Sequence, residues 1–94
     1  MQIVKSERYL SVLTSILRFI TLDSPSRARV FKRELEEKVK GVDHFPYKYR
    51  ESVHFESKEI RDMLYKGYVI PYFIDRDNEQ IVIIGIAKYK DGIA

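Results

Sequence analysis

Three apolar runs separated by turn residues make up most of the second half of the chain. They span residues 60–65, 68–74 and 81–86, and each is rich in β-branched and aromatic side chains. The residues between them, Lys66-Gly67 and 75–78, are turn formers that leave connections short enough for hairpins. This pattern predicts a three-stranded antiparallel meander.

The strands of this meander differ in how they should be buried. Residues 81–87 contain no polar side chain to turn towards water, so we expect a central strand covered on at least part of both faces. Pro71 cannot donate to a β-ladder, which predicts a local break in the middle strand. In the first strand, the period of two allows Arg61 to point away from Ile60 and Leu64, towards solvent, and we expect this orientation.

The first half of the chain carries two stretches of helical periodicity. Ser6 and Ser24-Pro25 should begin them, because serine is a favoured N-cap residue and proline fits the first helical position. Gly41 and Pro46 are stop signals for the second helix. The apolar faces consist of Tyr9, Val12, Leu13, Ile16, Leu17 and Ile20 in the first helix, and of Ala28, Phe31, Leu35, Val39 and Val42 in the second. Two such faces predict a helical hairpin.

The remaining segments complete an α+β architecture. Residues 1–5 are short and apolar enough to add a strand to the meander, and residues 44–58 form an irregular connection. The expected order is strand-helix-helix-strand-strand-strand, with the antiparallel sheet backed by the two-helix hairpin. A length of 94 residues is suited to one domain with one modest core, so we expect a single domain over residues 1–94.

Some apolar side chains exceed what this core needs. Leu10, Phe19 and Val30 widen the helical hairpin's apolar surface beyond what one sheet would hide. Surplus apolar surface of this kind indicates a groove or a binding partner.

Composition excludes several classes of protein. There is no cysteine, so neither a disulfide framework nor a thiolate metal site is possible. The two histidines have no ligand-spaced companions, the four glycines form no phosphate-binding loop, and no serine lies in a nucleophile elbow. We therefore expect neither a metal nor a cofactor. The chain shows no signal-peptide pattern and no membrane-spanning apolar run, which predicts a cytoplasmic protein.

Positive charge is concentrated in the first half of the chain. The net charge is +3, and residues 1–50 hold eleven Lys or Arg against six Asp or Glu. Basic groups interleaved with aromatic ones can hold a nucleic-acid backbone or an acidic partner, although a solvated helical face gives a similar count. The basic candidates around the meander are Arg50, Arg61, Lys66 and Lys88, accompanied by Tyr89.

The order of elements and several short motifs resemble the RelE/ParE superfamily of toxins from bacterial type II toxin–antitoxin systems. The motifs are residues 24–31 at the start of the second helix, Phe45-Pro46 followed by Arg50, and residues 60–72 leading to 83–86. The resemblance implies a compact sheet backed by two helices and a cognate antitoxin that wraps a disordered tail around the toxin. It also implies an oligomer formed through the antitoxin. Because Leu10, Phe19 and Val30 are surplus to the core, we expect them to bind this antitoxin.

The two branches of the superfamily imply different targets. RelE-like members cut mRNA on the ribosome and commonly have an arginine where this chain has Val69. An arginine is frequent at this position in ParE-like members too, so Val69 does not decide between the branches. The basic cluster that RelE-like members have after the last strand is only partly matched by residues 88–90. ParE-like members, which are known as plasmid stabilisation toxins, bind DNA gyrase and need no catalytic set. We expect a ParE-like gyrase inhibitor. Its target-binding residues would be Arg50, Arg61, Lys66, Lys88 and Tyr89.

Three alternatives remain open at this point. One is a ribosome-dependent RNase of the RelE type, which would use Arg61, Lys66, Lys88 and Tyr89. Another is a protein that has lost toxicity and only binds an antitoxin. The last is a basic interaction domain unrelated to toxins.

Overall fold

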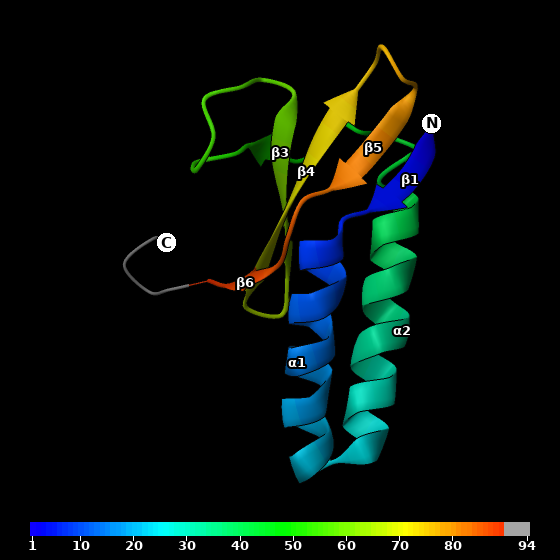
Figure 1. Ribbon diagram of the computed structural model, residues 1–94, viewed down its shortest axis with the longest axis vertical. Coiled ribbons are helices and arrows are strands. Elements are labelled where there is room, and N and C mark those ends of the chain that lie inside the picture. Colours follow the sequence, from blue (N-terminus) through cyan, green and yellow to red (C-terminus); the bar gives the residue numbers. More distant parts are fainter. Residues whose placement is uncertain (90–94) are drawn as a thin grey trace.

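The computed structural model describes residues 1–89, which form two helices and six strands (Figure 1). In chain order these are β1 (Gln2–Lys5), α1 (Glu7–Asp23), α2 (Pro25–Gly41), β2 (Arg50–Glu51), β3 (Ile60–Tyr65), β4 (Tyr68–Asp75), β5 (Gln80–Ile83) and β6 (Ala87–Lys88). The predicted α+β class and the order of the predicted elements are confirmed. The two-residue strand β2 lies in the segment that was expected to be irregular.

The sheet has the strand order β1-β5-β4-β3-β2, and β6 also pairs with β4. The predicted meander is present as the antiparallel pairs β3–β4 and β4–β5, while β1 adds to β5 in parallel. β5 is therefore an interior strand, as its apolar run predicted, although it ends at Ile83. Ile81 and Ile83 are fully buried, and Val82 on the other face is partly buried.

A β-bulge lies opposite Pro71. Val69 pairs with Ala87 and Tyr72 pairs with Ile83, so two residues of β4 face the three residues 84–86. β4 runs through Pro71 without interruption, and its partner strand is the one that breaks. The Ile84 N–H donates to the Pro71 carbonyl over 2.9 Å, which ties the bulged segment to the sheet.

Both helices begin at the predicted serines. The Ser6 hydroxyl accepts from the Tyr9 N–H, and the Ser24 hydroxyl accepts from the Arg27 N–H, with Pro25 in the first helical position. Figure 1 shows the two helices side by side, with the turn between them projecting beyond the sheet. In residues 1–89 no helix is long and apolar enough to cross a membrane.

The core lies between one face of the sheet and the hairpin. Its buried side chains are Tyr9, Leu13, Phe31, Leu35, Val39, Val42, Met63, Tyr65, Ile70, Tyr72, Ile74, Ile81, Ile83 and Ile86. The orientation predicted for β3 is wrong, because Met63 and Tyr65 face the helices while Leu64 is 42% exposed. Tyr65 packs edge-on against Phe31 with 5.2 Å between ring centroids, and this contact places Arg61 on the helix side of the sheet as well.

Candidate functional site

Three of the predicted target-binding residues lie together at the end of the β3–β4 hairpin. The Arg50 guanidinium lies 5.6 Å from the centroid of the Tyr89 ring, and the Tyr89 N–H donates to the Gly67 carbonyl over 2.7 Å. The Lys88 amine lies 5.9 Å from the centroid of the Tyr68 ring. Arg50, Lys88 and Tyr89 thus form one basic and aromatic group. Lys90, the next basic residue along the chain, lies outside the described residues.

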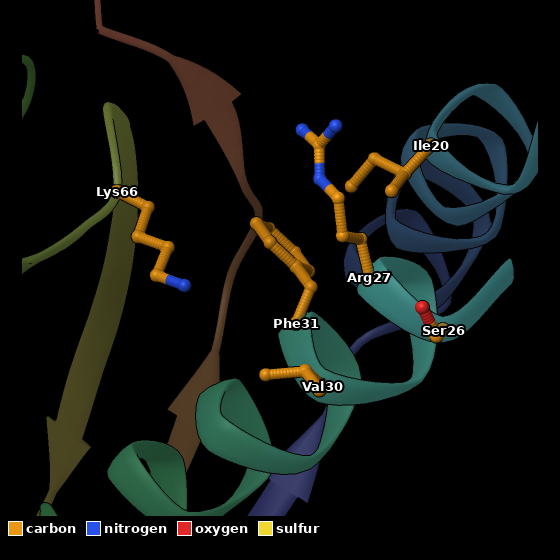
Figure 2. A pocket seen from close by; sticks show the side chains of 6 residues that line it. All are labelled: Ile20, Ser26, Arg27, Val30, Phe31 and Lys66. Carbon is orange, nitrogen blue, oxygen red and sulfur yellow. The ribbon is translucent and has the colours of Figure 1, made fainter. Parts of the chain in front are cut away.

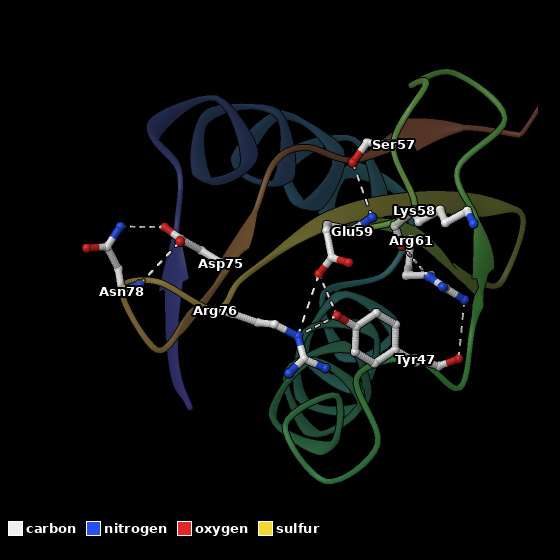
Figure 3. Close-up of polar contacts among 8 residues, drawn as sticks. All are labelled: Tyr47, Ser57, Lys58, Glu59, Arg61, Asp75, Arg76 and Asn78. Carbon is white, nitrogen blue, oxygen red and sulfur yellow. Dashed lines mark hydrogen bonds and ion pairs between the residues drawn. The ribbon is translucent and has the colours of Figure 1, made fainter.

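Arg61 is not part of this group, and its guanidinium is occupied by backbone carbonyls. It donates to the carbonyls of Lys58 and Tyr49 over 3.0 Å each, and to that of Tyr47 over 3.4 Å. Figure 3 shows the arginine beside Tyr47, whose ring centroid lies 4.9 Å from the guanidinium carbon. Arg61 therefore fastens the long β2-containing connection to β3, and the expectation that it points freely into solvent is wrong.

The Tyr47 ring belongs to a second cluster that fastens the same connection. Its hydroxyl donates to Glu59, and the Arg76 Nε donates to that hydroxyl over 2.9 Å (Figure 3). Arg76 also forms an ion pair with Glu59 at 3.9 Å. These groups satisfy one another's hydrogen-bonding capacity. The cluster therefore has a structural role, which is to hold the connection against the β4–β5 turn.

Lys66 is directed to helix α2 and is separate from Arg50. Its amine forms an ion pair with Glu34 at 3.2 Å, and the Tyr65 hydroxyl donates to the same carboxylate over 2.8 Å. The hydrogen bond from Tyr65, followed by the contact with Lys66, lowers the pKa of Glu34 below its ordinary value. Burial, helped by the carboxylate, raises the pKa of Tyr65 to about 12. Lys66 thus joins the β3–β4 turn to the hairpin.

Asp62 is a residue that the sequence analysis missed. It is 1% exposed, and its Oδ2 accepts from the Val53 N–H over 3.2 Å and lies 3.6 Å from an Arg50 nitrogen. A buried carboxylate beside a half-exposed arginine holds that arginine in place. Asp62 therefore positions Arg50 next to Tyr89. A lone acidic residue inside an apolar strand was the signal for it.

The bulge creates a hollow of about 410 Å³ beside the Arg50 group. We call this the bulge hollow. Its lining residues are Arg8, His54, Val69, Pro71, Ile84, Gly85, Ile86, Ala87 and Lys88. All of its ionisable lining side chains are basic types, and most of its floor is aliphatic.

The projecting end of the hairpin forms a second surface. Phe19 is 76% exposed and Leu22 is 87% exposed. They rim a hollow of about 410 Å³ that shares Ile20 and Arg27 with a groove of about 230 Å³. In Figure 2 this groove has Val30 and Phe31 between Arg27 on one side and Lys66 on the other. We call this continuous surface the hairpin strip; it consists of Phe19, Ile20, Leu22, Arg27, Val30 and Phe31.

Two of the three predicted antitoxin-binding residues belong to the hairpin strip. Phe19 and Val30 are joined through the shared residues Ile20 and Arg27. Leu10 is 46% exposed but lies nine positions before Phe19, which is about two and a half helical turns. Its side chain therefore leaves the opposite side of α1. The structure joins Phe19 with Val30 and does not join Leu10 to them.

Residues 1–89 contain no cluster of metal-binding side chains. No group of three or more histidine, cysteine, aspartate or glutamate side chains comes close enough there to hold an ion. The described residues thus present two distinct surfaces, one basic and aliphatic and the other predominantly apolar.

Comparison with known proteins gives one family and one fold. The family model described as "ParE toxin of type II toxin-antitoxin system, parDE" matches residues 3–91. Among solved structures, a chain of the chromosomal ParDE TA system from P. aeruginosa is similar, with a TM-score of 0.75 and 16% sequence identity. The alignment covers 96% of this chain and 97% of that chain, and at this identity it establishes the shared fold. No curated protein matches the sequence.

Proposed function

The chain belongs to the ParE toxin family of type II toxin–antitoxin systems, and from this premise we propose that it inhibits DNA gyrase by binding in the cytoplasm and is neutralised by a cognate antitoxin. We further propose that residues 1–94 act as a single domain and that toxin molecules join larger assemblies through the antitoxin.

The choice of target rests on one observation, which is that the side chains of Arg61 and Lys66 are both engaged in contacts within the protein. An mRNA nuclease of the RelE type would need groups free to activate the ribose hydroxyl and to stabilise the charge on phosphorus. Arg61 is engaged with three carbonyls, and Lys66 is paired with Glu34 on the helix side. This arrangement favours inhibition by binding over RNA cleavage.

The hairpin strip supports the proposal of an antitoxin. Phe19 and Leu22 expose large apolar areas at the projecting end of a hairpin whose other end is packed against the sheet. A disordered antitoxin segment that folds on this strip would bury that area and give a large negative heat-capacity change on binding. Calorimetry with the protein encoded by the adjacent reading frame measures this change directly.

Two assays on the purified protein test the target. We expect inhibition of gyrase supercoiling and no translation-dependent cuts when an mRNA is mapped by primer extension. Cuts in the mRNA together with unaffected supercoiling would reverse the assignment to a ribosome-dependent RNase. A protein without effect in either assay that still binds the antitoxin would be a non-toxic remnant.

A further inference from the structure

The bulge hollow combines cationic side chains with an aliphatic floor. Arg8 comes from the first turn of α1, His54 from the β2–β3 connection and Lys88 from β6, so three separate segments contribute basic residues to the lining. The Lys88 amine itself lies over the Tyr68 ring. Val69, Pro71 and the bulged residues supply the floor, and no acidic side chain lines the hollow. A surface with this lining attracts an anionic ligand that also carries an apolar group.

Hydrogen bonds hold the walls of the hollow in a fixed arrangement. The Ser6 hydroxyl donates to the Ile84 carbonyl over 2.7 Å, and the Ser6 N–H donates to the Ile83 carbonyl over 3.1 Å. The residue that caps α1 is therefore also the residue that fastens the helix to the bulge. This dual role sets Arg8 beside Ile84, and the Ile84 N–H bond to Pro71 holds the opposite wall. A hollow whose walls are tied in this way is largely formed before a ligand arrives.

The lining distinguishes between classes of anionic ligand. Binding of single-stranded nucleic acid depends strongly on aromatic side chains that stack on bases. The lining of the bulge hollow contains no phenylalanine, tyrosine or tryptophan, and its one aromatic ring is the imidazole of His54. The neighbouring Tyr89 ring is already covered by Arg50. An arginine pairs well with a carboxylate, and a branched aliphatic side chain fits an aliphatic floor. The chemistry favours an acidic peptide segment with an aliphatic anchor.

We propose that the bulge hollow binds an acidic, aliphatic segment of the toxin's protein target, while the hairpin strip serves the antitoxin. The inference rests on the proposed function, since it requires a protein target and an antitoxin. It is supported by the separation of the two surfaces, which share no lining residue. Arg8 and His54, which the sequence analysis did not single out, thereby become target-binding residues beside Lys88.

Two variants test the hollow without disturbing the core. Arg8→Glu combined with Lys88→Glu reverses two exposed charges, and Ala87→Phe fills the hollow from an exposed position without changing charge. The matched control is Lys32→Glu combined with Lys58→Glu, because both lysines are exposed and neither lines the bulge hollow or the hairpin strip. Gyrase supercoiling, antitoxin calorimetry and thermal melting are measured for each protein.

We expect both hollow variants to need at least a tenfold higher concentration than the parent to inhibit supercoiling, with unchanged antitoxin affinity and melting temperature. The control should inhibit as the parent does.

The inference would be overturned if either hollow variant inhibited supercoiling as well as the parent does. It would also be overturned if the control lost as much inhibition as the hollow variants. Loss of antitoxin binding in the hollow variants would assign the hollow to the antitoxin instead. If the parent shifts a single-stranded oligonucleotide in a gel and the charge-reversed variant does not, the ligand is nucleic acid and the inference is wrong. A parent that leaves supercoiling intact would overturn the proposed function itself, which is a different result.

Discussion

The two ends of the helical hairpin both carry large apolar side chains, but in opposite environments. At the sheet end, Leu13, Leu35 and Val39 are at most 6% exposed, whereas Phe19 and Leu22 at the projecting end are at least 76% exposed. Both sets of side chains are apolar and lie on the same pair of helices. The difference arises because the hairpin extends past the sheet (Figure 1) and because Phe19 and Leu22 lie off the inward face of α1, where Ile20 still packs against the core. Apolar periodicity therefore finds the helices, while the extent of the sheet decides which apolar residues stabilise the fold and which remain available to a partner.

The largest expected effect on stability comes from the sheet end. Leu35 is fully buried, so Leu35→Ala should lower the free energy of unfolding by about 2 to 5 kcal/mol through lost contacts and a cavity. The matched variant at the other end, Leu22→Ala, should stay within about 0.5 kcal/mol of the parent because the side chain is exposed. Urea denaturation of the two variants measures both values, and equal losses would contradict the contrast between the two ends.

Arg61→Ala should have the next largest effect. Its guanidinium donates to the carbonyls of Lys58, Tyr47 and Tyr49, and removing it leaves these acceptors without that donor. We expect a loss of about 1 to 3 kcal/mol in the free energy of unfolding and faster proteolysis within residues 44–58. Lys58→Ala, which removes only an exposed side chain, is the control. If Arg61→Ala melted as the parent does while growth inhibition was lost, Arg61 would be a target-binding residue after all.

Features that depend on local chemistry could be predicted from the sequence. Ser6, Ser24 and Pro25 begin their helices as predicted, because capping depends on neighbours three positions away or fewer. The irregularity expected at Pro71 is present, but it lies in residues 84–86 of the partner strand and not in β4 itself. Local chemistry of this kind can be recognised in one sequence.

Features that depend on distant partners were missed. The face of β3 that meets the helices is decided by Met63 and Tyr65 packing on α2, and the alternating pattern allowed either face. The role of Asp62 depends on Arg50, which reaches it only because β2 pairs with β3. β2 itself has two residues, which is too short to give an alternating pattern. Of the five predicted target-binding residues, the structure brings Arg50, Lys88 and Tyr89 together and separates Arg61 and Lys66 from them.

A smaller, pH-dependent effect is expected at Glu34, where the hairpin meets the β3–β4 turn. The Tyr65 hydrogen bond and the Lys66 ion pair lower its pKa in the folded protein below the ordinary value of 4.5. The stabilisation is therefore complete above the unfolded-state pKa and is lost as pH falls through the lower folded-state pKa. Glu34→Gln should melt slightly below the parent at pH 7, and the two melting temperatures should converge at pH 2. If the difference in melting temperature did not narrow on acidification, the Glu34 carboxylate would not be the source of the stabilisation.

The smallest effect on stability is expected at the projecting end. Phe19→Asp combined with Leu22→Asp places charges where the parent has solvent-exposed apolar side chains, so the melting temperature should not fall. The same variant should lose antitoxin binding in calorimetry, whereas Leu10→Asp, on the opposite side of α1, should keep it. Tight binding by the double variant would remove the hairpin strip from the antitoxin interface.

The most direct test of the account is a gyrase supercoiling assay performed with and without the antitoxin, comparing the parent with the variant that combines Phe19→Asp and Leu22→Asp. Without the antitoxin, both toxins should inhibit supercoiling. With the antitoxin, inhibition by the parent should be relieved and inhibition by the variant should persist. Relief of both toxins by the antitoxin, or a variant that no longer inhibits gyrase, would contradict the division of the molecule into a hairpin strip for the antitoxin and a separate surface for the target.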